Sequence, residues 1–161
     1  MSVFDSYLMV DWSAANAPTR GHDSIWLGLT VRRPSGLTLA KLENPPTRAE
    51  ATARIIDLAG RELTRDRRLL IGFDFPFGYP AGTAARLGLR GLAWQNLWQT
   101  LEDRITDGKD NRNNRFDVAE SLNKDMTGEA FPFWGLAHEE QRAHLVRRNR
   151  RPHNPGDLAE R

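Results

Sequence analysis

The stretch that decides the fold is RLLIGFD, from Arg68 to Asp74. Its unbroken apolar run predicts a strand buried on both faces of a sheet, and DSYLMVD, from Asp5 to Asp11, predicts a second strand of this kind. Each run closes on an aspartate, which is costly to bury even in part unless a partner compensates its charge. The two stretches therefore predict central strands that carry Asp11 and Asp74 at their carboxyl ends.

The segment between these runs predicts two more strands and one helix. SIWLGLTVRR (residues 24–33) and LTLAKLE (residues 37–43) are rich in β-formers, and the Pro-Ser-Gly between them favours a hairpin. After two prolines, Thr47 with Glu50 three positions later matches a capping box, which predicts a helix that begins there. A right-handed crossover through this helix returns the last strand to the side of the first. The predicted fold is therefore an α/β mixed sheet of order β-β-β-α-β.

This topology brings Asp11 and Asp74 together. Ligands of open α/β sheets gather at the carboxyl ends of the strands. Two neighbouring carboxylates repel each other unless a cation, a shared proton or hydrogen-bond donors lie between them. Carboxylate oxygens of this kind suit Mg²⁺ or Mn²⁺. Both aspartates are therefore predicted metal ligands.

The two aspartate motifs, DSYLMVDWSAAN and LLIGFDFPFGYP, resemble the ribonuclease-H-like superfamily. More narrowly, they resemble a bacterial family of unknown function whose members are predicted to be nucleases. The resemblance covers residues 5–80, and its most specific part is the turn after Asp74. Relatives sometimes carry labels for molybdopterin-guanine-dinucleotide or cobalamin biosynthesis, but this chain has neither a glycine-rich nucleotide loop nor a cobalamin signature.

The resemblance implies a metal-dependent nuclease, or a related phosphohydrolase, that acts on phosphodiester bonds with Mg²⁺ or Mn²⁺ through two metal ions. Asp11 and Asp74 would be catalytic and metal-binding residues, and the family pattern places a third such residue at Glu50 on the crossover helix. The expected partner is a nucleic acid or a nucleotide-like phosphodiester.

Such a site also needs groups that bind phosphate and a last carboxylate. Arginines suit the first role, although a solvated helix end is the favoured interpretation of the clustered ones. The candidates for phosphate binding are Arg115, Arg147 and Arg148. The sequence does not choose among three candidates for the last acid, Asp117, Glu120 and Asp125.

The chain after Phe75 predicts helices rather than strands. Apolar residues at helical spacing predict a helix from Leu92 to Ile105, and others are expected over 115–126 and 136–150. Core packing is the favoured interpretation of Trp94 and Trp98, and stacking on a nucleobase is the alternative. Because residues 81–161 offer no fifth strand, we expect one ribonuclease-H-like domain, with a sheet core over 5–80 and a helical segment over 81–161, that is an N-terminal fragment of a longer protein.

The composition excludes several classes of protein. The 161 residues contain no cysteine, which excludes disulfides, thiolate zinc sites and cysteine nucleophiles. No stretch approaches the roughly 18 consecutive apolar residues of a membrane span, and no signal peptide is visible. The formal net charge of +2 does not mark a basic domain. These features predict a cytoplasmic protein without a membrane partner and leave the oligomeric state open.

Two alternatives to a nuclease remain open. An accessory protein of a cofactor pathway could keep the fold without the chemistry. An actin-like or sugar-kinase-like ATPase shares the strand order, but it needs a glycine-rich phosphate loop after the first strand. The corresponding residues 12–16 (WSAAN) contain no glycine, which disfavours the ATPase.

Overall fold

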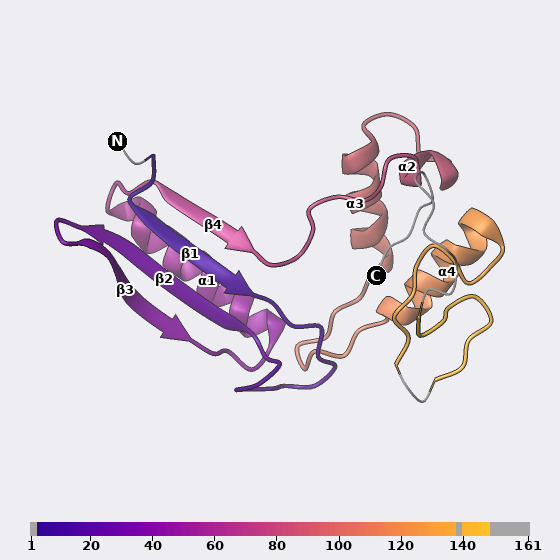
Figure 1. Cartoon of the computed structure of the whole chain (residues 1–161), viewed down its shortest axis with the longest axis horizontal. Coiled ribbons are helices and arrows are strands. Elements are labelled where there is room, and N and C mark those ends of the chain that lie inside the picture. Colours follow the sequence, from indigo (N-terminus) through magenta and orange to yellow (C-terminus); the bar gives the residue numbers. More distant parts are fainter. Residues whose placement is uncertain (1–2, 138–139, 149–161) are drawn as a thin grey trace. The chain divides into compact units, whose positions relative to one another are not determined.

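A computed structural model describes residues 3–137 and 140–148 of the chain (Figure 1). The chain forms two units, which are described separately. The first unit contains the chain up to Phe75 together with Asp107–Arg112, and the second contains Pro76–Thr106 and the chain from Asn113 onward. No helix within the described ranges is both long enough and apolar enough to cross a membrane.

The first unit is built on a four-stranded mixed sheet. Its strands are β1 (Ser6–Asp11), β2 (Trp26–Arg33), β3 (Gly36–Glu43) and β4 (Leu69–Phe73), in the spatial order β3-β2-β1-β4. β2 pairs antiparallel with both β1 and β3, whereas β4 pairs parallel with β1. The predicted α/β class, the four strands and the return of the last strand beside the first are confirmed.

Helix α1 (Arg48–Thr64) covers one face of this sheet (Figure 1). It begins as predicted, because the side chain of Thr47 accepts a hydrogen bond from the backbone N–H of Glu50 at 3.2 Å. Ala51 and Leu58 of the helix pack against alternate residues of the strands. These strand residues form the core of the unit and are Leu8, Val10, Leu27, Leu29 and Val31. Each fully buried leucine or valine contributes about 1.5–3 kcal/mol to the stability of this layer.

The expectation that β1 and β4 are buried on both faces is wrong. Met9 of β1 is 56% exposed and Leu70 of β4 is 40% exposed, because no described element of the first unit covers the face of the sheet opposite α1. Buried and more exposed residues alternate along β1, which is the pattern of a sheet that is covered on one face. A continuous apolar run does not distinguish a strand that is buried on both faces from one that is buried on a single face, because exposed apolar residues are common at protein surfaces.

An ion pair joins the end of β3 to α1 and makes stability depend on pH. Arg54 binds both carboxylate oxygens of Glu43, at 2.6 and 2.8 Å, and this bidentate hydrogen bonding lowers the pKa of Glu43 from 4.5 to about 2. A carboxyl group whose pKa is lowered on folding stabilises the protein above its unfolded pKa, and this contribution disappears as the pH falls through the folded pKa. The stabilisation is therefore present above pH 4.5 and lost toward pH 2.

We expect the Glu43→Gln variant to lose part of the pH dependence of stability in this window. Its free energy of unfolding should lie below that of the wild type at pH 7, and the two values should converge as the pH falls from 4.5 toward 2. Urea unfolding at a series of pH values measures this difference. Glu102→Gln, at an exposed glutamate of the second unit, is the control and should follow the wild type. A constant offset at every pH would contradict the prediction.

The second unit is helical. It contains α2 (Thr83–Arg86), α3 (Ala93–Arg104) and α4 (Arg115–Thr127), so the helices predicted over 92–105 and 115–126 are confirmed. The core of this unit combines side chains of α3 and α4 with residues that follow α4. These are Leu101, Val118, Leu122, Phe133, Leu136 and Leu145.

The helix predicted over residues 136–150 is wrong. None of residues 136, 137 and 140–148 is helical, and the end of the predicted range lies outside the described residues. The backbone instead pairs with distant groups: Gly135 donates to the carbonyl of Val146 at 2.9 Å, and the buried amide of Asn123 donates to the carbonyl of His144 at 2.7 Å. These long-range bonds use backbone groups that a helix would need.

The prediction for the apolar face of α3 is only half right. Leu97 and Leu101 are buried, but Trp94 is 66% exposed and Trp98 is 37% exposed. The indole N–H of Trp98 donates to the carbonyl of Phe77 at 3.1 Å, and its ring packs edge-on against Tyr79. Helical spacing identified the correct face but overestimated the width of the strip that is covered.

Candidate functional site

The two predicted strand-end aspartates meet. Asp11 is the last residue of β1, and Asp74 directly follows β4. The parallel register pairs Val10 with Phe73, so the next residue of each strand lies beside the other. Both side chains are exposed, and the two carboxyl groups lie close enough to share a proton through a hydrogen bond. The strand order therefore produces the carboxylate pair that the sequence predicted.

The pair has unusual electrostatics. Loss of hydration at the strand end, followed by the hydrogen bond and the negative charge of Asp74, raises the pKa of Asp11 above its ordinary value of 3.8. A like charge at hydrogen-bond distance penalises ionisation of a carboxyl group. A proton shared by the two groups relieves this repulsion, and so does a cation bound between them. The pair is thus suited chemically to bind a cation.

Asp74 is also held by the backbone directly after the neighbouring strand β1. The backbone N–H of Trp12 donates to Oδ1 of Asp74 at 2.9 Å. The side chain of Trp12 packs edge-on against Phe73 at 6.2 Å and Phe75 at 6.4 Å between ring centroids. These rings flank the two aspartates in the sequence, and their packing stabilises both strand ends in one arrangement.

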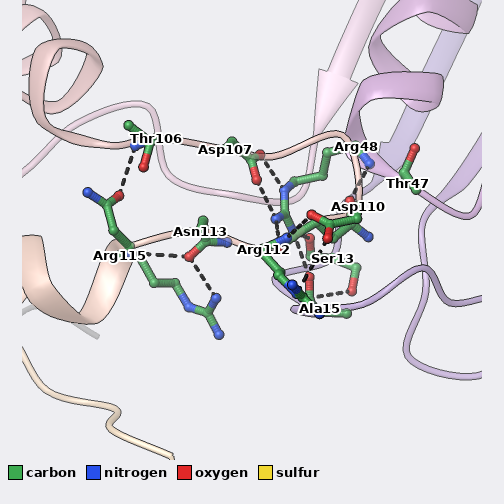
Figure 2. Close-up of polar contacts among 12 residues, drawn as sticks. Ser13, Ala15, Thr47, Arg48, Thr106, Asp107, Asp110, Arg112, Asn113 and Arg115 are labelled. Atoms are coloured by element: carbon green, nitrogen blue, oxygen red, sulfur yellow. Dashed lines mark hydrogen bonds and ion pairs between the residues drawn. The ribbon is translucent and has the colours of Figure 1, made fainter.

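A buried arginine fixes the loop that follows Asp11 (Figure 2). The guanidinium of Arg48 donates to the carbonyls of Ser13 at 3.1 Å and Ala15 at 2.9 Å. It also forms a bidentate ion pair with Asp107, with both N···O distances at 2.6 Å. Only 8% of the Arg48 side chain is exposed. One side chain therefore connects the start of α1, the loop after β1 and the segment Asp107–Arg112.

Asn111 completes this connection. Its side-chain oxygen accepts the backbone N–H of Arg48 at 2.8 Å, and its amide group donates to the carbonyls of Ala17 and Pro46, both at 3.2 Å. The residue is 2% exposed and has a φ of 70°, a left-handed conformation that asparagine tolerates better than most residues. Asn111 thus stabilises the amino terminus of α1 from a segment far away in the sequence.

Glu50, the third predicted ligand, lies in the first turn of α1 and is exposed. It is at the end of the sheet where β1 ends, because its neighbour Arg48 binds the loop after Asp11. Within residues 3–137 and 140–148, no group of three or more histidine, aspartate or glutamate side chains is arranged to hold a metal. The structure thus brings two of the three predicted ligands together, and the role of Glu50 stays a prediction.

The predicted phosphate-binding arginines belong to the second unit. Arg115 begins α4, where its guanidinium donates to Oδ1 of Asn113 at 2.9 Å (Figure 2). The same guanidinium stacks on the ring of Phe116. Arg147 and Arg148 are exposed and lie outside any helix. Their role as phosphate ligands stays a prediction.

The three candidates for the last carboxylate each have an arginine partner within the second unit. Arg142 binds Asp117 at 2.6 Å and Glu120 at 3.2 Å, so these two acids share a face of α4. Asp125 pairs with Arg104 at 3.2 Å. The structure therefore gives all three acids a role in ion pairs within the second unit, and the choice of a last carboxylate stays open.

Sequence reasoning missed Arg48, Asp107 and Asn111. Asp107 and Asn111 lie in a polar stretch without hydrophobic periodicity, and a long-range ion pair leaves no periodic signal in a sequence. One indication was available: Arg48 directly follows the N-cap, where a positive charge opposes the helix dipole and needs a partner. A cation at that position indicates a buried acceptor elsewhere in the chain.

A comparison of the chain with known protein families, known proteins and solved structures found no match.

Proposed function

We propose that this protein is a divalent-cation-dependent phosphodiester hydrolase of the ribonuclease-H-like type, with Asp11 and Asp74 at its centre. The observation that carries the proposal is the carboxylate pair at the ends of two parallel, adjacent strands. The β-β-β-α-β order and the mixed sheet support the same superfamily. A nucleic acid or nucleotide-like phosphodiester is the proposed substrate.

The donor set fits a hard cation. Mg²⁺ in proteins is commonly held by one or two carboxylates, with water and substrate phosphate oxygens as its other ligands. Asp11 and Asp74 supply two such carboxylates, and Glu50 is the proposed third ligand, directly or through water. When bound, the cation would activate water and stabilise the leaving oxygen of the phosphodiester. Arg115, Arg147 and Arg148 are the proposed phosphate contacts.

Chain elements that carry no metal ligand support the proposed site. Arg48 holds the loop after Asp11, and the backbone N–H of Trp12 holds Asp74. Their geometry keeps both carboxyl groups at one edge of the sheet before any ligand binds. A site of this kind loses little conformational entropy when it captures a cation, because its ligands are ordered in advance.

The test is metal-dependent cleavage. Single-stranded, duplex and RNA–DNA hybrid oligonucleotides are incubated with the full chain in Mn²⁺, in Mg²⁺ and in chelator. We expect cleavage of at least one substrate with metal, none with chelator and none by the Asp11→Asn variant. Asp103→Asn, at an exposed aspartate of α3, is the matched control and should cleave like the wild type.

Absence of cleavage from every substrate would overturn the enzymatic proposal. If Mn²⁺ nevertheless binds and Asp11→Asn abolishes that binding, the metal site survives and an accessory protein that keeps the fold becomes the better explanation. Cleavage that persists in Asp11→Asn would instead identify a contaminating nuclease and would remove the support for this site.

A further inference from the structure

The first unit contains a second concave site, a cleft of about 370 Å³ between α1 and the β2–β3 hairpin. Its floor is apolar, formed by Leu29, Val31 and Leu58, and its rim is charged. The charged residues that line it are Arg33, Lys41, Arg61, Glu62, Arg65 and Arg67. The cleft exists because α1 covers β1 and β2 but leaves the edge strand β3 exposed along most of its length.

This cleft is distinct from the carboxylate pair. Val31, in its floor, pairs with Ser6, the first residue of β1, whereas Asp11 is the last. The five residue steps between Ser6 and Asp11 span roughly 16 Å at the usual rise of a strand. Leu29, also in the floor, pairs with Leu8, three steps or roughly 10 Å from Asp11. The floor lies on the face of the sheet that α1 covers, whereas Asp11 alternates with the buried residues of β1. The cleft therefore needs its own explanation.

Glu62 organises the cationic rim. Its carboxylate is 1% exposed and receives ion pairs from Arg65 at 2.9 Å and Arg67 at 3.0 Å. Burial opposes ionisation, but the hydrogen bonds from Arg67 and Arg65 outweigh it and lower the pKa of Glu62. A guanidinium has five N–H donors, and Glu62 binds only one terminal nitrogen of each arginine. Two guanidinium groups are therefore held in place with donors left for a ligand.

The charges around the cleft do not balance. Lys41 pairs with Glu43, and Arg61 pairs with Asp57, which Arg54 also binds. Arg33 forms no side-chain hydrogen bond or ion pair with any residue in the described ranges. The five cations that line the cleft and the neighbouring Arg54 make six positive charges. They face three carboxylates, Glu43, Asp57 and Glu62. A concave surface with surplus positive charge and an apolar floor attracts polyanions.

We propose that this cleft binds the phosphate groups of a small polyanion, either free pyrophosphate or the diphosphate end of a nucleotide. The planar fork of an arginine matches two phosphate oxygens at once. Arg33, at the end of β2, supplies one such fork, and Arg65 and Arg67, directly after α1, supply two more. The apolar floor strengthens these contacts because it lowers the local dielectric constant. The site requires neither a metal nor Asp11, so it goes beyond the proposed hydrolase activity.

The test is a titration of the full chain with pyrophosphate in the presence of chelator. Isothermal titration calorimetry measures the affinity, and the amide chemical shifts in NMR spectra locate the binding site. We expect shifts in α1, β2 and β3, and saturable binding. Arg33→Ala should weaken binding by at least roughly tenfold, because it removes a charge-assisted contact. The amide NMR spectrum of free Arg33→Ala should otherwise match that of the wild type, because the Arg33 side chain supports no other described residue. Arg86→Ala, at an exposed arginine of α2, is the charge-matched control.

Parallel titrations with ADP and AMP distinguish the two sources of phosphate. Equal affinity for pyrophosphate and ADP, with weaker binding of AMP, supports recognition of the diphosphate alone. Tighter binding of ADP supports a nucleotide ligand. No saturable binding of pyrophosphate, or equal weakening by Arg33→Ala and Arg86→Ala, would overturn the proposal. Asp11→Asn should bind pyrophosphate like the wild type, so this result is independent of the hydrolase test.

Discussion

Replacing Arg48 with methionine should lower the free energy of unfolding by about 3 kcal/mol. Methionine keeps most of the length of the side chain but removes every hydrogen bond of the guanidinium. The carbonyls of Ser13 and Ala15 lose their donor, and Asp107 loses its bidentate partner. Asp107 is 41% exposed and can recover water, so the expected loss lies at the lower end of the range for a broken buried pair.

Urea unfolding, followed by far-ultraviolet circular dichroism, measures this loss. Arg112→Met is the matched control from the same segment, because Arg112 pairs with Asp110 but its side chain is 86% exposed. A surface ion pair of this kind is worth less than about 1 kcal/mol. Equal losses in the two variants would show that the buried connection contributes no more than a surface pair, and would contradict the role assigned to Arg48.

Arg48→Lys separates charge from geometry. Lysine keeps the positive charge but cannot form the bidentate contact with Asp107 and reach both carbonyls. We expect its stability to fall between the wild type and Arg48→Met. Because Arg48 orders the loop directly after Asp11, both variants should also weaken Mn²⁺ binding, although neither changes a proposed metal ligand.

The sheet could be predicted from the sequence because its signals are local. Thr47 and Glu50 define the start of α1 within four residues, and each strand is an apolar run bounded by turn residues. The pairing of Asp11 with Asp74 then follows from the handedness of a single crossover. Few other arrangements of these elements are possible, so local patterns were sufficient.

The remainder of the fold depends on contacts that no local pattern encodes. Arg48 and Asp107 are 59 positions apart, and their ion pair could not be anticipated from either neighbourhood. The segment predicted as a helix over 136–150 contains good helix formers, but Asn123 and Trp134 engage its backbone from outside. Tertiary hydrogen bonds overrode helix propensity there, since propensity amounts to only a few tenths of a kcal/mol per residue.

Asp11→Asn should abolish Mn²⁺ binding at the carboxylate pair. Loss of a residue that only supports a metal ligand typically costs 10–100-fold in affinity, so loss of a ligand itself should exceed about 100-fold. Asp74→Asn should have the same effect without disturbing the strand ends, because an amide oxygen can still accept the N–H of Trp12. Titration of Mn²⁺ followed by electron paramagnetic resonance measures the affinity, with Asp103→Asn as the control.

The raised pKa of Asp11 adds a second readout. Protons compete with the cation for the carboxyl oxygens. As the pH falls, Mn²⁺ affinity should therefore begin to decline at a higher pH than it would at an aspartate with the ordinary pKa of 3.8. Asp74→Asn removes the like charge, so the pKa of Asp11 should fall, which carboxyl-carbon chemical shifts would report. Because an aspartate with a raised folded pKa loses stabilising free energy as the pH rises, metal-free Asp74→Asn should be at least as stable as the wild type at pH 7. Unchanged Mn²⁺ binding in both variants, or an Asp11 pKa that does not respond to Asp74→Asn, would remove the carboxylate pair as the metal site.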